Sequence, residues 1–368
     1  MRLADLPTPA LVLDRAALLR NLRMMAGSVS RHGVTLRPHL KTAKSIDVAM
    51  LAAPGFGPIT VSTLAEARYL AEAGFRDQIY AVGIVPAKLD AVAALNAKGA
   101  DVKVITDDLE AARAVAAHPG RIRALIEIDT GAGRGGLTPD DETVPAIASA
   151  LGSRFAGVLT HGGHSYAGRS VEEIRQVAEN ERAGIVRAAE RLRAAGNEVA
   201  IVSMGSSPSV LNAASLAGVT EVRAGVYMFG DLMQVQLHTQ PLEDVAVSVL
   251  ASVIGRRPAQ NRLLIDAGAL ALSKDRGTQT MAKDYGFGLV VDLAGRPVFG
   301  DAIVTRTYQE HGVVESDRPL PFDALPVGAR VRVLPNHSCH TAAAHPHYHV
   351  VDGASDEVVA VWPRVNYW

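Results

Sequence analysis

Short aliphatic runs alternate with longer amphipathic runs between about residues 15 and 235. The aliphatic runs are rich in Val and Ile and end at Gly, Pro or a polar residue, which is typical of buried parallel strands. Between them lie helix patterns such as residues 64–74, where apolar positions share one face and Gly74 supplies the stop. There are eight such runs, at residues 34–38, 59–62, 79–83, 102–106, 122–129, 155–161, 199–205 and 220–225. A doubly wound sheet has the same alternation, but eight units favour a closed (β/α)8 barrel.

The pattern changes after about residue 240, where strand-like runs follow one another without long amphipathic helices. This pattern predicts an antiparallel β domain. The opening run TPALVLD, residues 8–14, is expected to add a strand to it. The predicted fold is therefore α/β, a (β/α)8 TIM-type barrel followed by a C-terminal antiparallel β domain. We assign residues 15–238 to the barrel, and residues 1–14 and 239–368 to the β domain.

Composition narrows the range of partners. Lys and Arg number 37 against 38 Asp and Glu, so the 368-residue chain has no basic field for nucleic acid or an anionic membrane. No apolar run approaches the ~20 residues needed to span a bilayer, and the N-terminus lacks the apolar core of a secretory signal. A single Cys excludes an internal disulfide and favours a reducing, cytoplasmic location.

Reactive side chains follow the predicted barrel strands, whose C-terminal ends carry the chemistry in such barrels. Lys41 comes directly after the first strand, and Gly/Ser loops follow the seventh and eighth strands. Those loops suit a phosphate at the usual barrel position, although tight βα turns alone would also explain them. If the phosphate belongs to a cofactor, Lys41 is the natural Schiff-base lysine, with its pKa lowered by burial near cations such as Arg37.

These residues, in this order, resemble the fold-type III pyridoxal-phosphate (PLP) enzymes, which are alanine racemase-like. The resemblance is greatest to the branch of D-serine dehydratase, D-threo-3-hydroxyaspartate dehydratase and D-threonine aldolase, and it covers essentially the whole chain. Its most specific part is RPHLKTAKS, which implies that Lys41 and not Lys44 binds the cofactor. In family members the open end of one subunit's barrel faces the β domain of a partner subunit, so the resemblance implies a homodimer.

The resemblance also assigns the other cofactor contacts. Arg134 matches the arginine at the cofactor's ring oxygen, and His161 matches a ring-stacking or acid/base histidine. Tyr166 is expected near the pyridine nitrogen. The residues that match the phosphate cup are Ser206, Ser207, Gly225 and Tyr227.

The C-terminal match is PNHSC, in which a His-x-Cys pair binds a divalent metal in this branch. Here the pair is His337 and Cys339, and on an extended strand such alternate residues point the same way. A thiolate favours Zn²⁺, with Mn²⁺ and Co²⁺ left open. Four more histidines follow within ten residues, and we expect most of them to be solvated or to lie outside the ligand shell, with one available to orient a ligand (His340, His345, His347 and His349).

The implied activity is that of a lyase acting on β-hydroxy-D-amino acids, which are small zwitterions. In a dehydratase, Lys41 takes the α-proton and the metal activates the β-hydroxyl, giving an α-keto acid and ammonia. In a D-threonine aldolase, retro-aldol cleavage gives glycine and an aldehyde, with His161 or a metal-bound water as base. The His-x-Cys pair favours the dehydratase, because the aldolases more often carry His-x-Asp.

Three other functions are weighed against these two. An amino-acid racemase needs a tyrosine from the β domain as second base, and Tyr285 and Tyr308 are available, but the metal pair argues against it. A non-catalytic PLP-binding protein would not need the β domain of about 130 residues. A binding protein on a degenerate barrel would carry no yellow chromophore.

Overall fold

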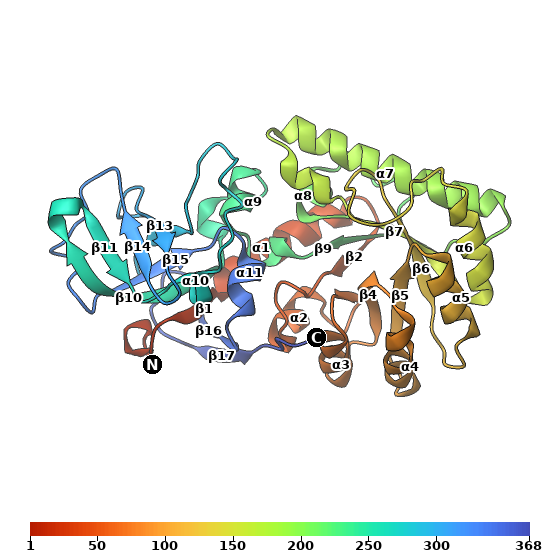
Figure 1. Cartoon of the computed structure of the whole chain (residues 1–368), viewed down its shortest axis with the longest axis horizontal. Helices are drawn as coiled ribbons and strands as arrows, with labels where there is room; N and C mark the ends of the chain where they lie inside the picture. The colour runs from red at the N-terminus through yellow and green to blue at the C-terminus, as the bar shows by residue number, and fades with distance from the viewer. The chain divides into compact units, whose positions relative to one another are not determined.

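The computed structural model describes all 368 residues, which form two compact units (Figure 1). One unit contains residues Met24–Gly225 together with Tyr367–Trp368, and the other contains Met1–Arg23 and Val226–Asn366. The divisions therefore fall at 23/24 and 225/226, where the sequence placed them at 14/15 and 238/239. Each unit is described below by itself.

The first unit is built on eight parallel strands, and each of the eight predicted runs coincides with one of them. In chain order they are β2 (Thr35–Pro38), β3 (Ile59–Val61), β4 (Asp77–Gly83), β5 (Asp101–Thr106), β6 (Ala124–Ile128), β7 (Phe155–Thr160), β8 (Ile201–Met204) and β9 (Glu221–Ala224). The hydrogen-bonded order runs from β3 through β4 to β9 and then to β2. A parallel bridge between His39 and Thr60 joins β2 to β3, so the barrel is nearly closed. The predicted fold class is confirmed.

A helix follows each of the strands β2 to β8, as a βα barrel requires, and one more helix precedes β2. These helices are α1 (Arg15–Ser30), α2 (Ile46–Ala52), α3 (Leu64–Glu72), α4 (Leu89–Ala97), α5 (Leu109–Ala117), α6 (Thr143–Leu151), α7 (Val171–Ala194) and α8 (Ser207–Asn212). Several helices have an N-cap residue whose side-chain oxygen accepts a hydrogen bond from the backbone N–H three residues later. Thr63, Asp108 and Ser170 are such caps. Such caps fix where each helix starts, and therefore how long the preceding loop is.

A buried ion network lies inside the barrel. Arg37, only 3% exposed, pairs with Glu221 at 2.8 Å and with Asp77 at 2.9 Å, and Lys103 pairs with the same Asp77 at 2.8 Å. These partners neutralise the Arg37 guanidinium. The expected effect of Arg37 on the pKa of Lys41 stays a prediction, and the structure adds that the Arg37 charge is balanced by its own ion pairs.

The second unit is built on a nine-stranded, mostly antiparallel sheet. Its strands are β1 (Ala10–Asp14), β10 (Val247–Arg257), β11 (Arg262–Ile265), β12 (Leu289–Val291), β13 (Ile303–Thr307), β14 (Gly312–Glu315), β15 (Arg330–Leu334), β16 (His347–Val351) and β17 (Ala360–Pro363). The N-terminal run lies in this sheet as expected, because β1 pairs antiparallel with β10 and parallel with β16. Leu3, Leu6, Val12 and Leu250 pack in the buried cluster beneath it.

Three short helices complete this unit, α9 (Leu232–Gln236), α10 (Ala269–Leu272) and α11 (Ser338–Ala343). The expectation that His337 and Cys339 lie on an extended strand is wrong. His337 is the N-cap of α11, and Cys339 lies in its first turn. The Ala-rich run that follows them favours a helix. In neither unit does any helix combine the length and the apolar character needed to cross a membrane.

Candidate active site and metal centre

Lys41 lies in the turn that follows β2. The backbone N–H of His39 donates to the carbonyl of Ala224 at 2.7 Å, and that of Leu40 donates to Thr60 at 2.8 Å, so the turn is anchored on both neighbouring strands. Lys41 itself is half-buried. Lys44 is held elsewhere, in an ion pair of 3.1 Å with the fully buried Glu66. Lys44 thus neutralises a buried carboxylate, which is a structural role.

Positive charge gathers around two histidines at this end of the barrel. Burial, Lys41 and Arg134 lower the pKa of His161 to about 3. Burial, Lys41 and Arg223 also hold the pKa of His39 well below its usual value. Both imidazoles are therefore neutral at neutral pH. The structure brings Lys41, Arg134 and His161 together, as the sequence predicted, and adds His39 and Arg223.

A single hydrogen bond sets the tautomer of His161. Its Nδ1 lies 3.1 Å from the carbonyl oxygen of Gly205, which can only accept. The proton is therefore on Nδ1, and Nε2 keeps its lone pair. Nε2 of His161 is thus a hydrogen-bond acceptor, and the low pKa makes the imidazole a weak base.

We expect His161 to make the cofactor-free protein less stable in acid. The unfolded chain binds a proton at a pKa near 6.5, while the folded chain binds it only near 3. The stabilisation is therefore complete above about pH 6.5 and is lost as the pH falls toward about 3. At about pH 5.5 the free energy of unfolding should therefore be about 1 kcal/mol lower than at neutral pH. Urea unfolding at about pH 7.5 and 5.5 should show a weaker pH dependence for His161→Gln, and an equal dependence would contradict the assignment.

Arg134 lies in the glycine-rich loop after β6. The backbone N–H groups of Gly131 and Gly133 donate to the carboxylate of Asp129 at 2.9 and 3.2 Å, which orders the loop. The guanidinium is 59% exposed and only 3.5 Å from Glu127, whose pKa burial raises. Arg134 is therefore loosely paired with Glu127, and the exposed guanidinium can turn its other N–H donors to an anionic or phenolic oxygen.

Close backbone approach shapes the ends of β8 and β9. A Cβ on Gly205, which has φ +134°, would meet the Arg223 carbonyl at 2.4 Å, and one on Gly225 would meet the His39 carbonyl at 2.7 Å. Only glycine fits at these positions. Gly225 therefore lies against the turn that carries Lys41.

The serines of the predicted phosphate cup lie beside these glycines. Ser206 caps α8, and its hydroxyl lies 2.8 Å from that of Ser165, which belongs to the same 3-10 segment as Tyr166 (Gly163–Ala167). Ser207 opens α8 and is buried. The serine cup and the Tyr166 segment are therefore in contact. Tyr227 lies in the other unit, fully buried.

Arg223 is a site residue that the sequence reasoning missed. It is buried and donates to Ser203 at 2.7 Å and to the Thr160 carbonyl at 2.6 Å, while its Nε has no partner. A charged residue inside the apolar run TEVRAG was the available signal. The carboxylates of Glu221, Glu181 and Glu127 balance the charge of Arg223, so the unpartnered, buried Nε is a donor left over for an oxygen of a ligand such as PLP.

His337 and Cys339 lie together at the start of α11, in the second unit. Burial lowers the pKa of His337, but hydrogen bonds with Asp275 and Cys339 outweigh it and raise the pKa to about 11. The proton held there is the one that a metal ion replaces on binding. A nitrogen and a sulfur donor side by side fit a borderline metal such as Zn²⁺.

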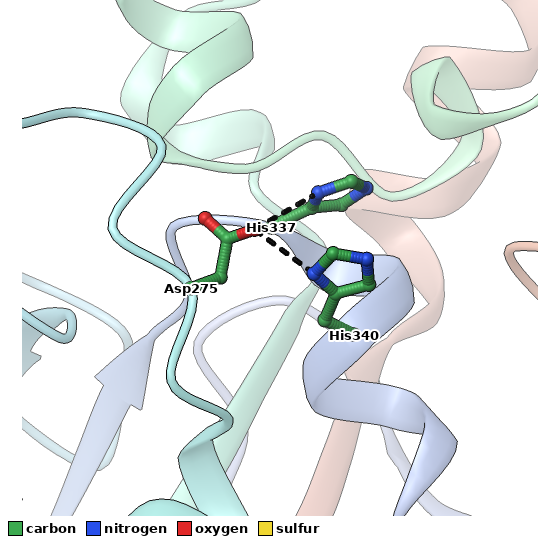
Figure 2. Close-up of side chains that lie close together, drawn as sticks. All are labelled: Asp275, His337 and His340. Carbon is green, nitrogen blue, oxygen red and sulfur yellow. Dashed lines mark hydrogen bonds and ion pairs between the residues drawn. The ribbon is translucent and has the colours of Figure 1, made fainter. Parts of the chain in front are cut away.

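Asp275 and His340 complete this cluster (Figure 2). The Asp275 carboxylate lies 3.5 Å from Nδ1 of His337 and 2.9 Å from Nδ1 of His340, and both imidazoles depress its pKa. Nothing in the sequence near residue 275 signals this contact, because some sixty residues separate it from PNHSC.

The N-terminus of α11 is fixed by one more buried carboxylate. Asp231 accepts from the backbone N–H of Ser338 at 3.2 Å through one oxygen, and through the other it caps α9 at 2.9 Å. The segment between His337 and Cys339 is thus tied to a second helix.

Comparison with known families matches residues 13–233 to "Alanine racemase, N-terminal domain" and residues 246–351 to "Putative serine dehydratase domain". The chain is 44% identical to D-threo-3-hydroxyaspartate dehydratase of a Delftia species, over 100% of this chain and 99% of that protein. A solved structure of that dehydratase matches with a TM-score of 0.95 at 42% identity, over 100% of both chains. Another of its structures is a cysteine-to-alanine mutant in a metal-free form.

Two further relatives represent both reactions considered above. D-serine dehydratase of Dictyostelium discoideum is 29% identical over 99% of this chain and 98% of that protein. D-threonine aldolase of an Arthrobacter species is 30% identical over 98% of this chain and 94% of that protein. With one family model matching more than half of its residues and a 44% identical relative spanning its full length, the chain belongs to the alanine racemase-like family that joins this N-terminal domain to a serine dehydratase domain.

Proposed function

We propose that the chain is a PLP- and divalent-metal-dependent lyase of β-hydroxy-D-amino acids, and that its reaction is dehydration to an α-keto acid and ammonia. The observation that carries the proposal is the contact of His337 with Cys339 at the start of α11. The full-length similarity to D-threo-3-hydroxyaspartate dehydratase, a cysteine mutant of which is metal-free, supports it.

PLP, when bound, supplies an electron sink for the charge that develops at the substrate's α-carbon. Lys41 would bind it covalently, and Arg134 would donate to its ring oxygen. Ser206, Ser207 and the backbone at Gly225 would hold its phosphate, and Tyr166 and Tyr227 are proposed as further contacts. His161, which is neutral and protonated on Nδ1, would contact the ring without adding a charge.

Lys41 is also the base in the proposed elimination, once the amino group of the substrate has replaced it on the cofactor and its own amine is free. Its amine takes the α-proton, the Cα–H electron pair forms the new double bond, and the β-hydroxyl leaves as hydroxide with the C–O electron pair. Water then converts the enamine to the keto acid and ammonia. His337 and Cys339 would hold the metal, preferably Zn²⁺, which supplies a Lewis acid for the departing oxygen.

The alternative is retro-aldol cleavage by the same residues. The Nε2 lone pair of His161 would take the hydroxyl proton, but a pKa of about 3 makes this imidazole a weak base for that step. The Cα–Cβ bond would then break to give glycine and an aldehyde. The thiolate ligand favours the dehydratase, because it accompanies a metal suited to a leaving hydroxide.

Product analysis tests the proposal. The purified chain is incubated with D-threo-3-hydroxyaspartate, D-serine and D-threonine, and keto acid plus ammonia is assayed against glycine plus aldehyde. We expect keto acid from at least one substrate, and its loss on exhaustive chelation with recovery on adding Zn²⁺. Glycine and aldehyde as the main products would establish the aldolase, and keto acid that survives chelation would refute the metal's role.

We also propose the compartment, the type of substrate and the oligomeric state in which this reaction takes place. A lone cysteine that serves as a metal ligand suits a reducing, cytoplasmic compartment. A near-neutral chain, with a formal charge of −1, suits a small zwitterion as partner. The homodimer stays a prediction, which sedimentation analysis of the purified chain tests.

A further inference from the structure

One carboxylate faces two imidazoles at the start of α11. Oδ2 of Asp275 approaches Nδ1 of His337 at 3.5 Å and Nδ1 of His340 at 2.9 Å, and the two rings stack with centroids 4.2 Å apart (Figure 2). The Asp275 side chain is 15% exposed, that of His337 31% and that of His340 59%. The carboxylate is therefore the most enclosed member of the cluster.

Asp275 is held in place from two directions. Its Oδ1 accepts from the backbone N–H of Gly277 at 2.6 Å, and its carbonyl accepts from the amide of Asn336 at 3.2 Å. Asn336 is buried and directly precedes His337, so the loop that carries Asp275 is tied to the residue before the proposed ligand. The carboxylate is thus fixed relative to the imidazole before any metal arrives.

This arrangement sets the tautomer of His337. A carboxylate only accepts, so the nitrogen facing it carries the proton. When a metal ion displaces one proton of the ring, Nδ1 keeps the other toward the carboxylate, and the metal binds Nε2, the nitrogen that points away from Asp275 in Figure 2. Carboxylates in this relation fix the ring orientation of metal-binding histidines and raise their basicity.

We propose that Asp275 is a positioning residue of the metal centre, which holds Nδ1–H of His337 so that Nε2 and the Cys339 thiolate bind one divalent ion. The inference rests on the metal centre proposed above. His340 shares the same carboxylate oxygen and does not bind the metal. If the His340 imidazole is removed, His337 is the one imidazole that remains in contact with Oδ2 of Asp275.

Metal affinity, measured without any turnover, tests this role. The dissociation constants for Zn²⁺ and Co²⁺ are obtained by competition with a chromophoric chelator on the PLP-loaded chain. We expect Asp275→Asn to bind both ions 10- to 100-fold more weakly, about the usual effect of removing such a partner. The Co²⁺ spectrum, including its thiolate-to-metal band, should keep its shape because the ligands are unchanged.

Two variants serve as matched controls. Asp284→Asn removes another aspartate of the same loop, one that is 40% exposed and paired with Arg276 at 2.6 Å, and should leave the affinity unchanged. His340→Ala should leave it within about threefold or make binding tighter. Unchanged affinity in Asp275→Asn would overturn the proposal. So would a changed Co²⁺ spectrum, which would make Asp275 a ligand, or a loss in His340→Ala equal to that in His337→Ala.

The proposed metal pair has its own test in the same assay. His337→Ala and Cys339→Ser should abolish tight binding, and if both bind normally the metal centre itself fails and this inference with it. Nitrogen NMR of the wild-type, Zn²⁺-loaded chain needs no substitution at Asp275. It should find the His337 proton on Nδ1, and a metal-bound Nδ1 would overturn the role of Asp275 even if Asp275→Asn does not fold.

Discussion

Replacing Lys41 by alanine is expected to remove both the covalent attachment of PLP and the base for the α-proton. The purified variant should lack the visible absorbance of lysine-bound PLP. Its kcat/KM for a β-hydroxy-D-amino acid should fall by at least about 10³-fold, since a positioned base alone contributes about 10²- to 10⁴-fold. Absorbance spectra and keto acid assays measure the two effects separately.

Lys44→Ala is the matched control for Lys41→Ala. Lys44 lies three residues further along the same turn, but its amine is engaged by the buried Glu66 at 3.1 Å. We expect that variant to keep the chromophore, and to lose stability because Glu66 is left as a buried, unpaired carboxylate. A Lys41→Ala chain that stays yellow and turns over substrate, or a Lys44→Ala chain that is colourless although folded, would contradict the assignment.

The barrel was predictable because its signals are local. Each strand is a short run of buried aliphatic residues, and the end of each run marks where a βα loop begins, so Lys41, Arg134 and His161 were found by reading strand ends. The chemistry of the family then assigned them roles. The same reading did not reveal the ion pairs of Arg37, because its partners Glu221 and Asp77 belong to strands far away in the sequence.

The metal centre was only half predictable for the same reason. His337 and Cys339 stand together in the chain, but their backbone is helical where alternation suggested a strand. Two carboxylates from distant loops support the site: Asp275, after α10, faces His337, and Asp231, before α9, accepts from the backbone of Ser338. Their contacts depend on how the sheet brings those loops together, and no local pattern encodes that.

Replacing Cys339 by alanine is expected to give a chain that retains no divalent metal after purification. The elimination rate should fall by about 10²- to 10³-fold, because a Lewis acid contributes several kcal/mol to stabilising the departing oxygen and each 1.36 kcal/mol is tenfold. Elemental analysis gives the metal content, and the absorbance of lysine-bound PLP should be unchanged because Lys41 is intact. A variant with normal metal content and normal turnover would show that Cys339 is not a metal ligand.

Replacing Cys339 by aspartate asks a different question, because it keeps a metal ligand and changes only its chemistry. An oxygen donor in place of the thiolate should keep the ion bound while elimination declines relative to carbon–carbon cleavage. We expect the ratio of keto acid to glycine from D-threo-3-hydroxyaspartate or D-threonine to fall at least about tenfold, equivalent to about 1.4 kcal/mol between two competing transition states. Both products come from one incubation, so the ratio is independent of how much enzyme is active. A ratio that does not move, in a variant with full metal content, would mean that Cys339 binds the metal without selecting the reaction.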